Sequence, residues 1–297
     1  MNIPDPLFFD SFLFNGEAIV KMRLAYLSPY VDRFYITESI YTFSGKKKDA
    51  FYVDKCQDWF APYGEKIRIV KIYERLSELT PGYPTGIESI DTMLSKYDSF
   101  KEEKAQRNYA RKQILADTPS PQKYTVAFAD VDEFYDLRTL GSKKIVWQAC
   151  QDHIVFFKQK GYMFNFIYEQ GEDICVALLI NSEMLQEHGD VDHIRAHKFG
   201  EKSIVIPSGW HFSYFMPAEE VQRKLGSYAH TENNKDEYNK KDYIHYMIVN
   251  GHDLFMRRDF KLRHVPYSPE FPEVFHSYFV ELCKVQGIDY TVSSTQG

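Results

Sequence analysis

The sequence lacks the patterns that mark secreted, membrane-spanning and disulfide-rich proteins. No window approaches the roughly 18–20 consecutive apolar residues of a membrane span. The N-terminal stretch MNIPDPLFFDSFLFNGE has no basic region of the kind that opens a signal peptide. The four cysteines form no Cys-x-x-Cys pair and are far apart: Cys56, Cys150, Cys175 and Cys283. Isolated cysteines of this kind are typical of reduced thiols. These absences predict a soluble, cytoplasmic protein without a membrane span.

Signatures of nucleotide-binding loops and of hydrolase active sites are also missing. No Gly-x-Gly-x-x-Gly follows a strand-like run, the SGKKK segment at 44–48 lacks the first glycine of a P-loop, and no Gly-x-Ser-x-Gly occurs. The net charge is −6 and the pI is about 5.9, which gives no general attraction to nucleic acid. We therefore expect no nucleic-acid partner.

What the sequence does contain is an alternation of strand-like and helix-like segments. With 297 residues, 44% of them apolar, the chain buries a sizeable core. The alternation is typical of an α/β fold with a mainly parallel sheet covered by helices on both faces. We predict one domain over 1–290, a flexible tail over 291–297 and a mobile lid at the turn-rich stretch 79–89. The expected strands are 7–14, 31–39, 66–73, 124–129, 162–168 and 174–181, and the expected helices are 16–29, 97–117, 143–158, 183–188, 217–226, 236–250 and 268–287.

The stretch YTVAFADVDEFYDL, at 124–137, places three acids directly after an apolar strand. Asp130, Asp132 and Glu133 stand within four positions. Two carboxylates ~4 Å apart repel by about 4 kcal/mol at an effective dielectric constant of ~20, so a cation is expected among them. In an extended chain, residues i and i+2 point to the same side, so Asp130 and Asp132 would face one site. Oxygen ligands of this kind suit Mg²⁺ or Mn²⁺ bridged to substrate phosphates.

Asp-Val-Asp occurs a second time, in EHGDVDHIRAH. Here Asp190 follows a helix-like segment and a glycine, a context that indicates a helix cap or a turn and not a metal ligand. The tripeptide alone is weak evidence, because it is expected by chance about once in a chain of this length. The apolar strand expected at 124–129, directly before Asp130, distinguishes the first copy from the second.

The helix expected at 97–117 carries a basic face. At 3.6-residue periodicity this face comprises Lys104, Arg107, Asn108, Arg111 and Leu115. A cationic helix face beside an acidic metal site predicts a diphosphate between them; the alternative is a salt-bridged surface helix. Later segments, IPSGWHFSYF and LGSYAHTE, supply Trp210, His211, His230 and Glu232, residue types that suit a third metal ligand and a catalytic base.

Taken together, these segments resemble glycosyltransferase family seventeen, the β-1,4-mannosyl-glycoprotein 4-β-N-acetylglucosaminyltransferases. The resemblance follows the family order over roughly residues 8 to 260. The segments that carry it are FFDSFLFNGE (8–17), VDRFYITESIYTFSGKKK (31–48), EKAQRNYARKQI (103–114), FADVDEF (128–134), SGWHFSYF (208–215) and SYAHTE (227–232).

The resemblance implies a GT-A-like fold with a Rossmann-type sheet, and an inverting, metal-dependent transfer of a sugar from a UDP-sugar to a glycan or glycoprotein acceptor. By family default the sugar is N-acetylglucosamine. Mn²⁺ (or Mg²⁺) would bind Asp130 and Asp132, with His230, or else His211, completing the ligands. The implied donor-site residues are Asp10, Glu38, Arg107, Asn108 and Asp130. Trp210 and His211 would contact the acceptor, and the candidates for the catalytic base are Asp173, Glu172 and Glu232.

Three alternatives stay open at this point. The donor sugar could be xylose or another UDP-linked sugar. A metal-dependent phosphatase also uses Asp-x-Asp, but such motifs favour Thr or Val two places after the second Asp, where this chain has Phe134. A non-catalytic glycan-binding protein would instead bind sugars by stacking them on its many Tyr and Phe rings.

Overall fold

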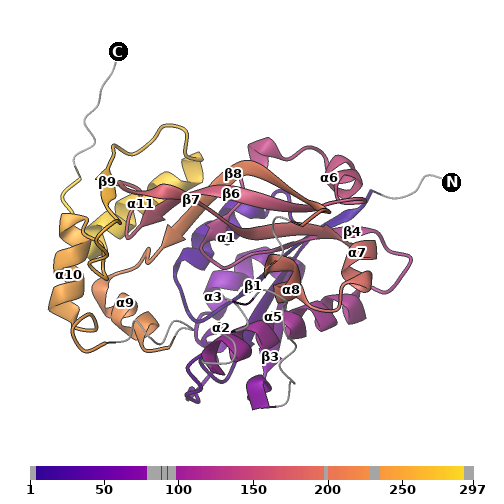
Figure 1. The fold of residues 1–297 in the computed structure, drawn as a ribbon, viewed down its shortest axis with the longest axis horizontal. Helices are drawn as coiled ribbons and strands as arrows, with labels where there is room; N and C mark the ends of the chain where they lie inside the picture. Colours follow the sequence, from indigo (N-terminus) through magenta and orange to yellow (C-terminus); the bar gives the residue numbers. More distant parts are fainter. Residues whose placement is uncertain are drawn as a thin grey trace.

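Figure 1 shows the computed structural model, in which one sheet runs through the molecule with helices packed against it. The structure describes residues 5–78, 88, 92, 98–196, 200–227 and 235–290, and it leaves the side chains of 171–176 undescribed. The predicted lid at 79–89 therefore falls almost wholly outside the described residues, and so does the predicted tail at 291–297. No helix in the described ranges has the length and apolar character needed to cross a membrane.

Nine strands in the described residues form the sheet, in the order β3-β2-β1-β4-β7-β6-β8-β5, with β9 paired to β7. The first four in this order are parallel to one another, β7 is antiparallel to both of its neighbours β4 and β6, and β6 and β8 are again parallel. The strands are β1 (Leu7–Leu13), β2 (Arg33–Ser39), β3 (Ile67–Ile72), β4 (Tyr124–Phe128), β5 (Glu133–Phe134), β6 (Ile154–Met163), β7 (Tyr168–Asn181), β8 (Ser203–Ser213) and β9 (Leu262–His264).

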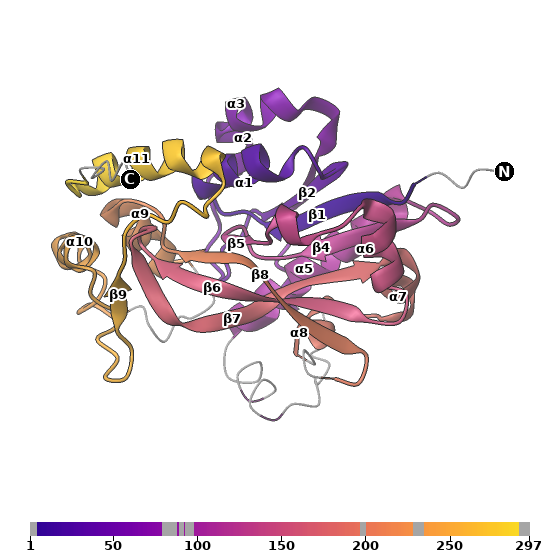
Figure 2. The ribbon, with the colours of Figure 1, turned by 90° about the horizontal axis from the view of Figure 1, so that it is seen from above.

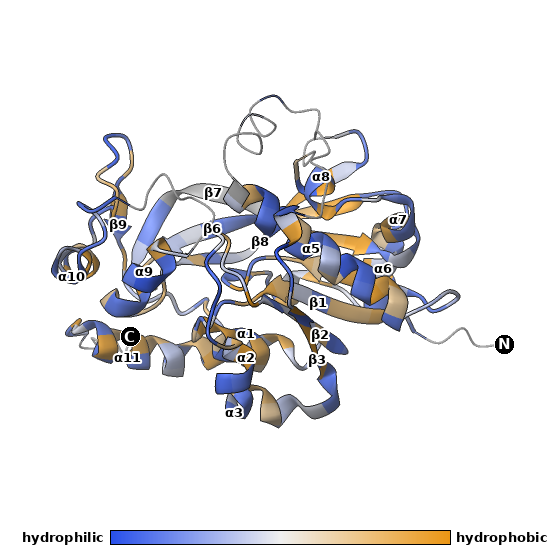
Figure 3. Cartoon of the chain, turned by 90° about the horizontal axis from the view of Figure 1, so that it is seen from below, coloured by the Kyte–Doolittle hydropathy of each residue, from blue (hydrophilic) through white to orange (hydrophobic). Residues whose placement is uncertain are grey.

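Helices cover both faces of this sheet, and Figure 2 shows α1 and α11 on one side of it and α8 on the opposite side. The larger core lies under α1 and α11, and a second core lies under α5, α7 and α8. The helices are α1 (Ile19–Leu27), α2 (Tyr52–Lys55), α3 (Gln57–Phe60), α5 (Asp98–Asp117), α6 (Lys143–Ala149), α7 (Ser182–Glu187), α8 (Val191–Ala196), α9 (Ala218–Leu225), α10 (Lys241–Asn250) and α11 (Glu273–Gln286). In Figure 3, α11 alternates between hydrophobic and hydrophilic colours, as an amphipathic helix on a core does.

The predicted fold class, an α/β arrangement with helices on both faces of a central sheet, is confirmed. The predicted strands 7–14, 31–39, 66–73 and 124–129 correspond to β1 to β4. Strands β1, β2 and β4 are buried on both faces, whereas the edge strand β3 is only partly buried. The expected helix 143–158 and strand 162–168 are wrong, because the helix ends at Ala149 and β6 already begins at Ile154. Strand β6 opens with the short apolar run IVFF. The periodicity of so short a run does not distinguish a buried strand from a buried helix, so the sequence pattern extended the helix too far.

A buried ion pair joins β1 to α1. Arg23 and Asp10 are both 0% exposed, and the guanidinium donates two hydrogen bonds to the carboxylate, at 2.8 and 2.7 Å. The remaining nitrogen of Arg23 donates to the backbone carbonyl oxygens of Asp130 and Glu133. One side chain on α1 therefore holds both the first strand and the turn that follows β4.

We expect Arg23→Met to destabilise the fold by about 3–5 kcal/mol, because it leaves the Asp10 carboxylate buried without its partner. The double variant with Asp10→Asn should recover part of this loss. Urea unfolding followed by circular dichroism measures both. Arg138→Met is the matched control, because its ion pair with Asp136 involves an arginine side chain that is 58% exposed, and it should change stability by less than about 1 kcal/mol. Equal losses in the free energy of unfolding for Arg23→Met and Arg138→Met would contradict the conclusion that the buried Arg23–Asp10 pair stabilises the fold.

Candidate active site

The acidic stretch after β4 forms a tight turn at the carboxyl end of the parallel strands. The Glu133 N–H donates to the carbonyl oxygen of Asp130, and the Asp130 N–H donates to the Glu133 carboxylate at 2.7 Å. The chain is therefore not extended here, and the predicted reason for Asp130 and Asp132 to face the same side was wrong. Both nevertheless line one cavity.

Strand β8 fixes the other side of this turn. The Phe212 N–H donates to the carbonyl oxygen of Asp132 at 2.8 Å, and the short strand β5 pairs with β8 so that Glu133 lies opposite His211. Gly209 has a φ of +83°, and a Cβ there would overlap the carbonyl oxygen of Phe134. Only glycine therefore lets β8 approach β5 this closely.

The cavity beside this turn has a volume of about 240 Å³. It opens where β1 and β4 end, the edge at which parallel α/β sheets bind ligands. Its lining combines four carboxylates with one lysine and one histidine. The lining residues are Leu13, Asn15, Glu17, Phe43, Glu103, Asp130, Val131, Asp132, His211, Ser213, Tyr214 and Lys224.

Asp132 faces two basic groups inside the cavity. The Lys224 ammonium lies 3.2 Å from one carboxylate oxygen, and Nε2 of His211 lies 3.7 Å from the other. The carboxylate side chain of Asp132 is only 11% exposed. Burial would lower the pKa of Lys224, but the charge of Asp132 outweighs this and raises it, so the ammonium stays charged.

Asp130 is held by two arginines. Arg107 of α5 donates to one oxygen at 2.8 Å, and Arg195 of α8 donates to both oxygens at 3.2 and 3.3 Å. Burial alone would raise the pKa of the Asp130 carboxyl, but the two guanidinium groups hold it well below its usual range. Asp130 is thus ionised and already balanced by positive charge.

Glu133, the third acid, is buried beneath the other two. Its exposed fraction is 1%, and its nearest cation is Arg195 at 3.8 Å. Burial, together with the charge of Asp130, raises the pKa of Glu133 to about 7. The three acids therefore do not carry equal charge near neutral pH.

Two side chains of the cavity have the chemistry of divalent-cation ligands. Asp132 supplies a carboxylate that faces the cavity, and His211 supplies an imidazole whose Nδ1 is buried without a hydrogen-bond partner among the described residues. Within those residues no group of three or more His, Cys, Asp or Glu side chains converges on one point. An ion here would keep positions for water and for substrate phosphates, which is how Mg²⁺ is commonly held.

Two predicted donor-site residues have structural partners instead. Asp10 is enclosed by Arg23, and the Tyr135 hydroxyl contacts it at 3.3 Å. Glu38 is 0% exposed and accepts hydrogen bonds from the first two backbone N–H groups of α2, at 2.8 Å each. A strand-end glutamate thus caps a helix rather than facing the cavity. Both carboxylates are paired inside the protein and do not line the cavity, and their role in donor binding stays a prediction.

The basic face of α5 is covered by the chain between α7 and α8. Asn108 accepts a hydrogen bond from the Val191 N–H, Arg111 donates to the Leu185 carbonyl, and Lys104 pairs with Asp190 at 3.1 Å. This face therefore makes ion pairs and contacts within the chain, as the alternative of a salt-bridged helix predicts, and Asn108 contacts the start of α8. Of this face, Arg107 alone among the described residues contacts an acid of the cavity lining.

The second Asp-Val-Asp is the helix cap that its sequence context indicated. The Asp190 carboxylate accepts a hydrogen bond from the His193 N–H at 3.0 Å, and Asp192 pairs with Arg107 at 3.1 Å. This copy therefore binds α8 to α5 through the Asp192–Arg107 ion pair, and the two helices lie next to each other in Figure 1.

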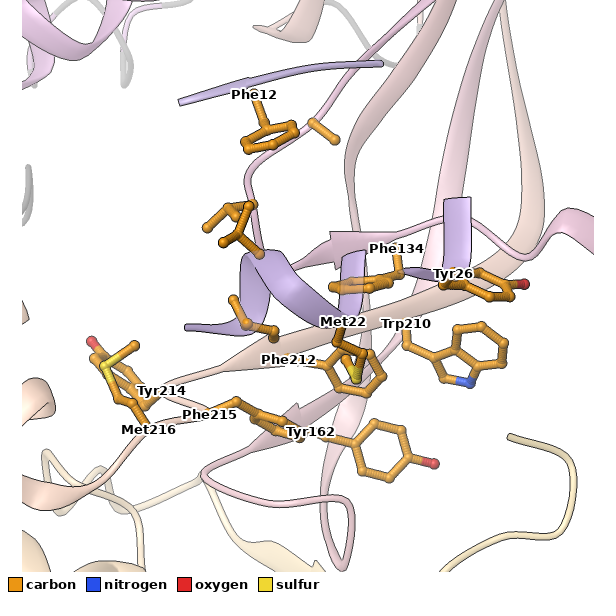
Figure 4. Close-up of a cluster of buried hydrophobic side chains, with 14 of the residues drawn as sticks. Phe12, Met22, Tyr26, Phe134, Tyr162, Trp210, Phe212, Tyr214, Phe215 and Met216 are labelled. Carbon is orange, nitrogen blue, oxygen red and sulfur yellow. The ribbon is translucent and has the colours of Figure 1, made fainter. Parts of the chain in front are cut away.

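Trp210, predicted as an acceptor platform, lies in the core in this structure, and its role at an acceptor stays a prediction. Its exposed fraction is 7%, and Figure 4 shows its ring in the buried aromatic cluster with Tyr26, Phe134 and Phe212. Alternation along β8 explains this: positions 210 and 212 face the core, whereas His211 faces the cavity. The imidazole that was predicted to contact the acceptor lies beside Asp132.

The remaining predicted residues are not placed by the structure. His230 and Glu232 lie outside the described residues, and Glu172 and Asp173 are described only by their backbone, on β7. Their roles stay predictions.

Four charged residues of the cavity or of its ion-pair cluster were not predicted. Glu17 and Glu103 lie inside segments that carry the family resemblance, so that resemblance was a usable signal for them. Arg195 and Lys224 lie outside those segments and become recognisable only when folding brings them to Asp130 and Asp132.

Comparison with known proteins gives a match along most of the chain. The family described as Glycosyltransferase family 17 matches residues 3–262. None of the curated proteins matches. Among solved structures, a 4-diphosphocytidyl-2C-methyl-D-erythritol synthase is similar, with a TM-score of 0.37 and 10% identity, over 75% of this chain and 99% of that chain.

Glu133 should make stability depend on pH. Its folded pKa of about 7 lies above the ordinary 4.5, so the folded protein holds a proton that the unfolded chain releases, and its contribution to stability falls as pH rises from about 4.5 to about 7. Thermal unfolding should show that the melting temperature falls less between pH 5 and pH 8 for Glu133→Gln than for the parent. Exposed Glu237→Gln is the control and should behave as the parent. A pH response unaltered by Glu133→Gln would contradict the raised pKa.

Proposed function

The chain belongs to glycosyltransferase family 17 and is a glycosyltransferase, and we propose that its cavity at the acidic turn binds a UDP-sugar donor together with Mn²⁺ or Mg²⁺. The single observation that supports this placement best is the pairing of Asp132 with His211 in a cavity at the carboxyl end of β1 and β4. A glycosyltransferase uses a nucleotide-sugar donor and an acceptor glycan. When the sugar is transferred, the nucleoside diphosphate of the donor leaves with additional negative charge, which a nearby positive group stabilises.

In this proposal the ion is held by Asp132 and Asp130, with His211 or His230 completing the protein ligands. The ion would act as a Lewis acid on the leaving diphosphate. Arg107 and Arg195 orient Asp130, since each donates a hydrogen bond to its carboxylate. Fixed side chains of this kind need little reorganisation when charge develops on the leaving group.

We further propose that the transfer inverts the sugar's anomeric carbon and that the sugar is N-acetylglucosamine by family default. Inversion in one step requires a carboxylate to accept the proton of the attacking acceptor hydroxyl. Asp173, Glu172 and Glu232 are the candidates from the sequence. The structure adds Glu17, whose side chain lines the cavity.

Family membership favours this proposal over the phosphatase and the non-catalytic glycan-binding protein. UDP-xylose or another UDP-sugar is the alternative donor within the same chemistry.

Asp132→Asn should keep the fold and abolish Mn²⁺-dependent binding of UDP-sugars. Donor hydrolysis should fall by at least roughly 100-fold, because several kcal/mol of charge stabilisation in the transition state is lost. A thermal-shift panel of UDP-sugars with and without Mn²⁺ measures binding and also ranks the donors.

Asp190→Asn is the matched control, since it changes the first acid of the other Asp-Val-Asp and asparagine also caps helices. It should leave the Mn²⁺-dependent shift intact. Unchanged manganese-dependent affinity in Asp132→Asn would defeat the assignment of the ion to this turn.

A further inference from the structure

The Lys224 ammonium pairs with the Asp132 carboxylate, which the proposed cation would also bind. Lys224 lies in the last turn of α9, and its ammonium is 3.2 Å from Asp132, inside the cavity lining. Among the described lining residues it is the one lysine or arginine; the acids around it are Glu17, Glu103, Asp130 and Asp132. Its charge therefore offsets part of a strongly acidic pocket.

The ammonium and a divalent cation compete for the same oxygens. A divalent cation carries two charges, so a Lys224 ammonium left in contact with the same Asp132 oxygens would repel it strongly. Asp132 is 11% exposed at its side chain, so it needs a positive partner whether or not an ion is bound. Lys224 supplies that partner when no ion is present.

Lys224 also has the means to move. Its side chain is 21% exposed, and the lysine stem is flexible, with a compact charge at its end. By contrast, the two arginines on Asp130 are about 10% exposed and fixed by several partners. Of the two acids, Asp132 is therefore the one whose cation can be exchanged.

We propose that Lys224 holds Asp132 until a divalent cation replaces it, and that the released ammonium then binds the diphosphate of the incoming donor. This inference rests on the proposed function, because it needs both the cation and a nucleoside diphosphate in this cavity. It makes Lys224 a donor-binding residue whose position is set by whether the cation is present.

The test measures two affinities that should change in opposite directions. Without nucleotide, Lys224→Met should bind Mn²⁺ about fivefold more tightly than the parent, because a competing partly exposed ion pair is gone. With saturating Mn²⁺, the same variant should bind UDP about tenfold more weakly, because one charge-assisted contact to phosphate is lost. Electron paramagnetic resonance of free Mn²⁺ reads the first affinity and titration calorimetry reads the second.

Two further variants make the result specific. Lys224→Arg keeps a cation on α9 and should restore both affinities toward those of the parent. Lys241→Met removes an exposed lysine that pairs with Glu219 on the surface, and should leave both affinities unchanged. Thermal unfolding of each variant confirms that the fold is kept.

The outcomes separate this inference from the function on which it rests. If the parent binds no Mn²⁺, the metal-dependent function itself fails. If the parent binds Mn²⁺ but Lys224→Met binds it equally well or more weakly, the exchange is wrong. Tighter Mn²⁺ binding with unaltered UDP affinity would show that the ammonium does not reach the diphosphate, and would also overturn the proposal.

Discussion

The buried contact between Arg23 and Asp10 is the constraint on which the site depends. An arginine that is fully excluded from water has to satisfy all its donors, and here it does so with one carboxylate and two backbone carbonyl oxygens of the acidic turn. The same guanidinium packs over the rings of Phe12 and Phe134. Strand β1, helix α1 and the turn after β4 are thereby fixed to a single group, which sets the position of the acids before any ligand arrives.

The crowding of acids in that turn is resolved by a separate partner for each one. Asp130 is balanced by two rigid arginines, Asp132 by one flexible lysine, and Glu133 by proton uptake. Three carboxylates that look equivalent in the sequence thus differ in charge and in access. Only the partner of Asp132 is both partly exposed and mobile by nature, which is why the chemistry proposed for the cavity centres on that residue.

Strand β8 joins the core and the cavity. Residues at alternating positions of one strand point to opposite faces, so Trp210 and Phe212 pack into the aromatic core while His211 and Ser213 face the acids. Gly209 permits the close approach of β8 to β5 that brings His211 to Asp132. The packing of the rings therefore places the imidazole, although none of those rings reaches the cavity itself.

The sequence by itself determined the α/β class, the first four strands and the acidic turn at the end of the last of them, because these are local properties: apolar runs, helical periodicity and a cluster of like charges after a strand. It also separated the two Asp-Val-Asp copies, since a helix cap has a local signature. Tertiary structure alone decided that Asp10 and Glu38 are enclosed, that the face of α5 is covered, and that Arg195 and Lys224 reach the acids. These facts depend on contacts between residues 13 to 92 positions apart, and no local pattern encodes which buried partner a charged side chain will meet.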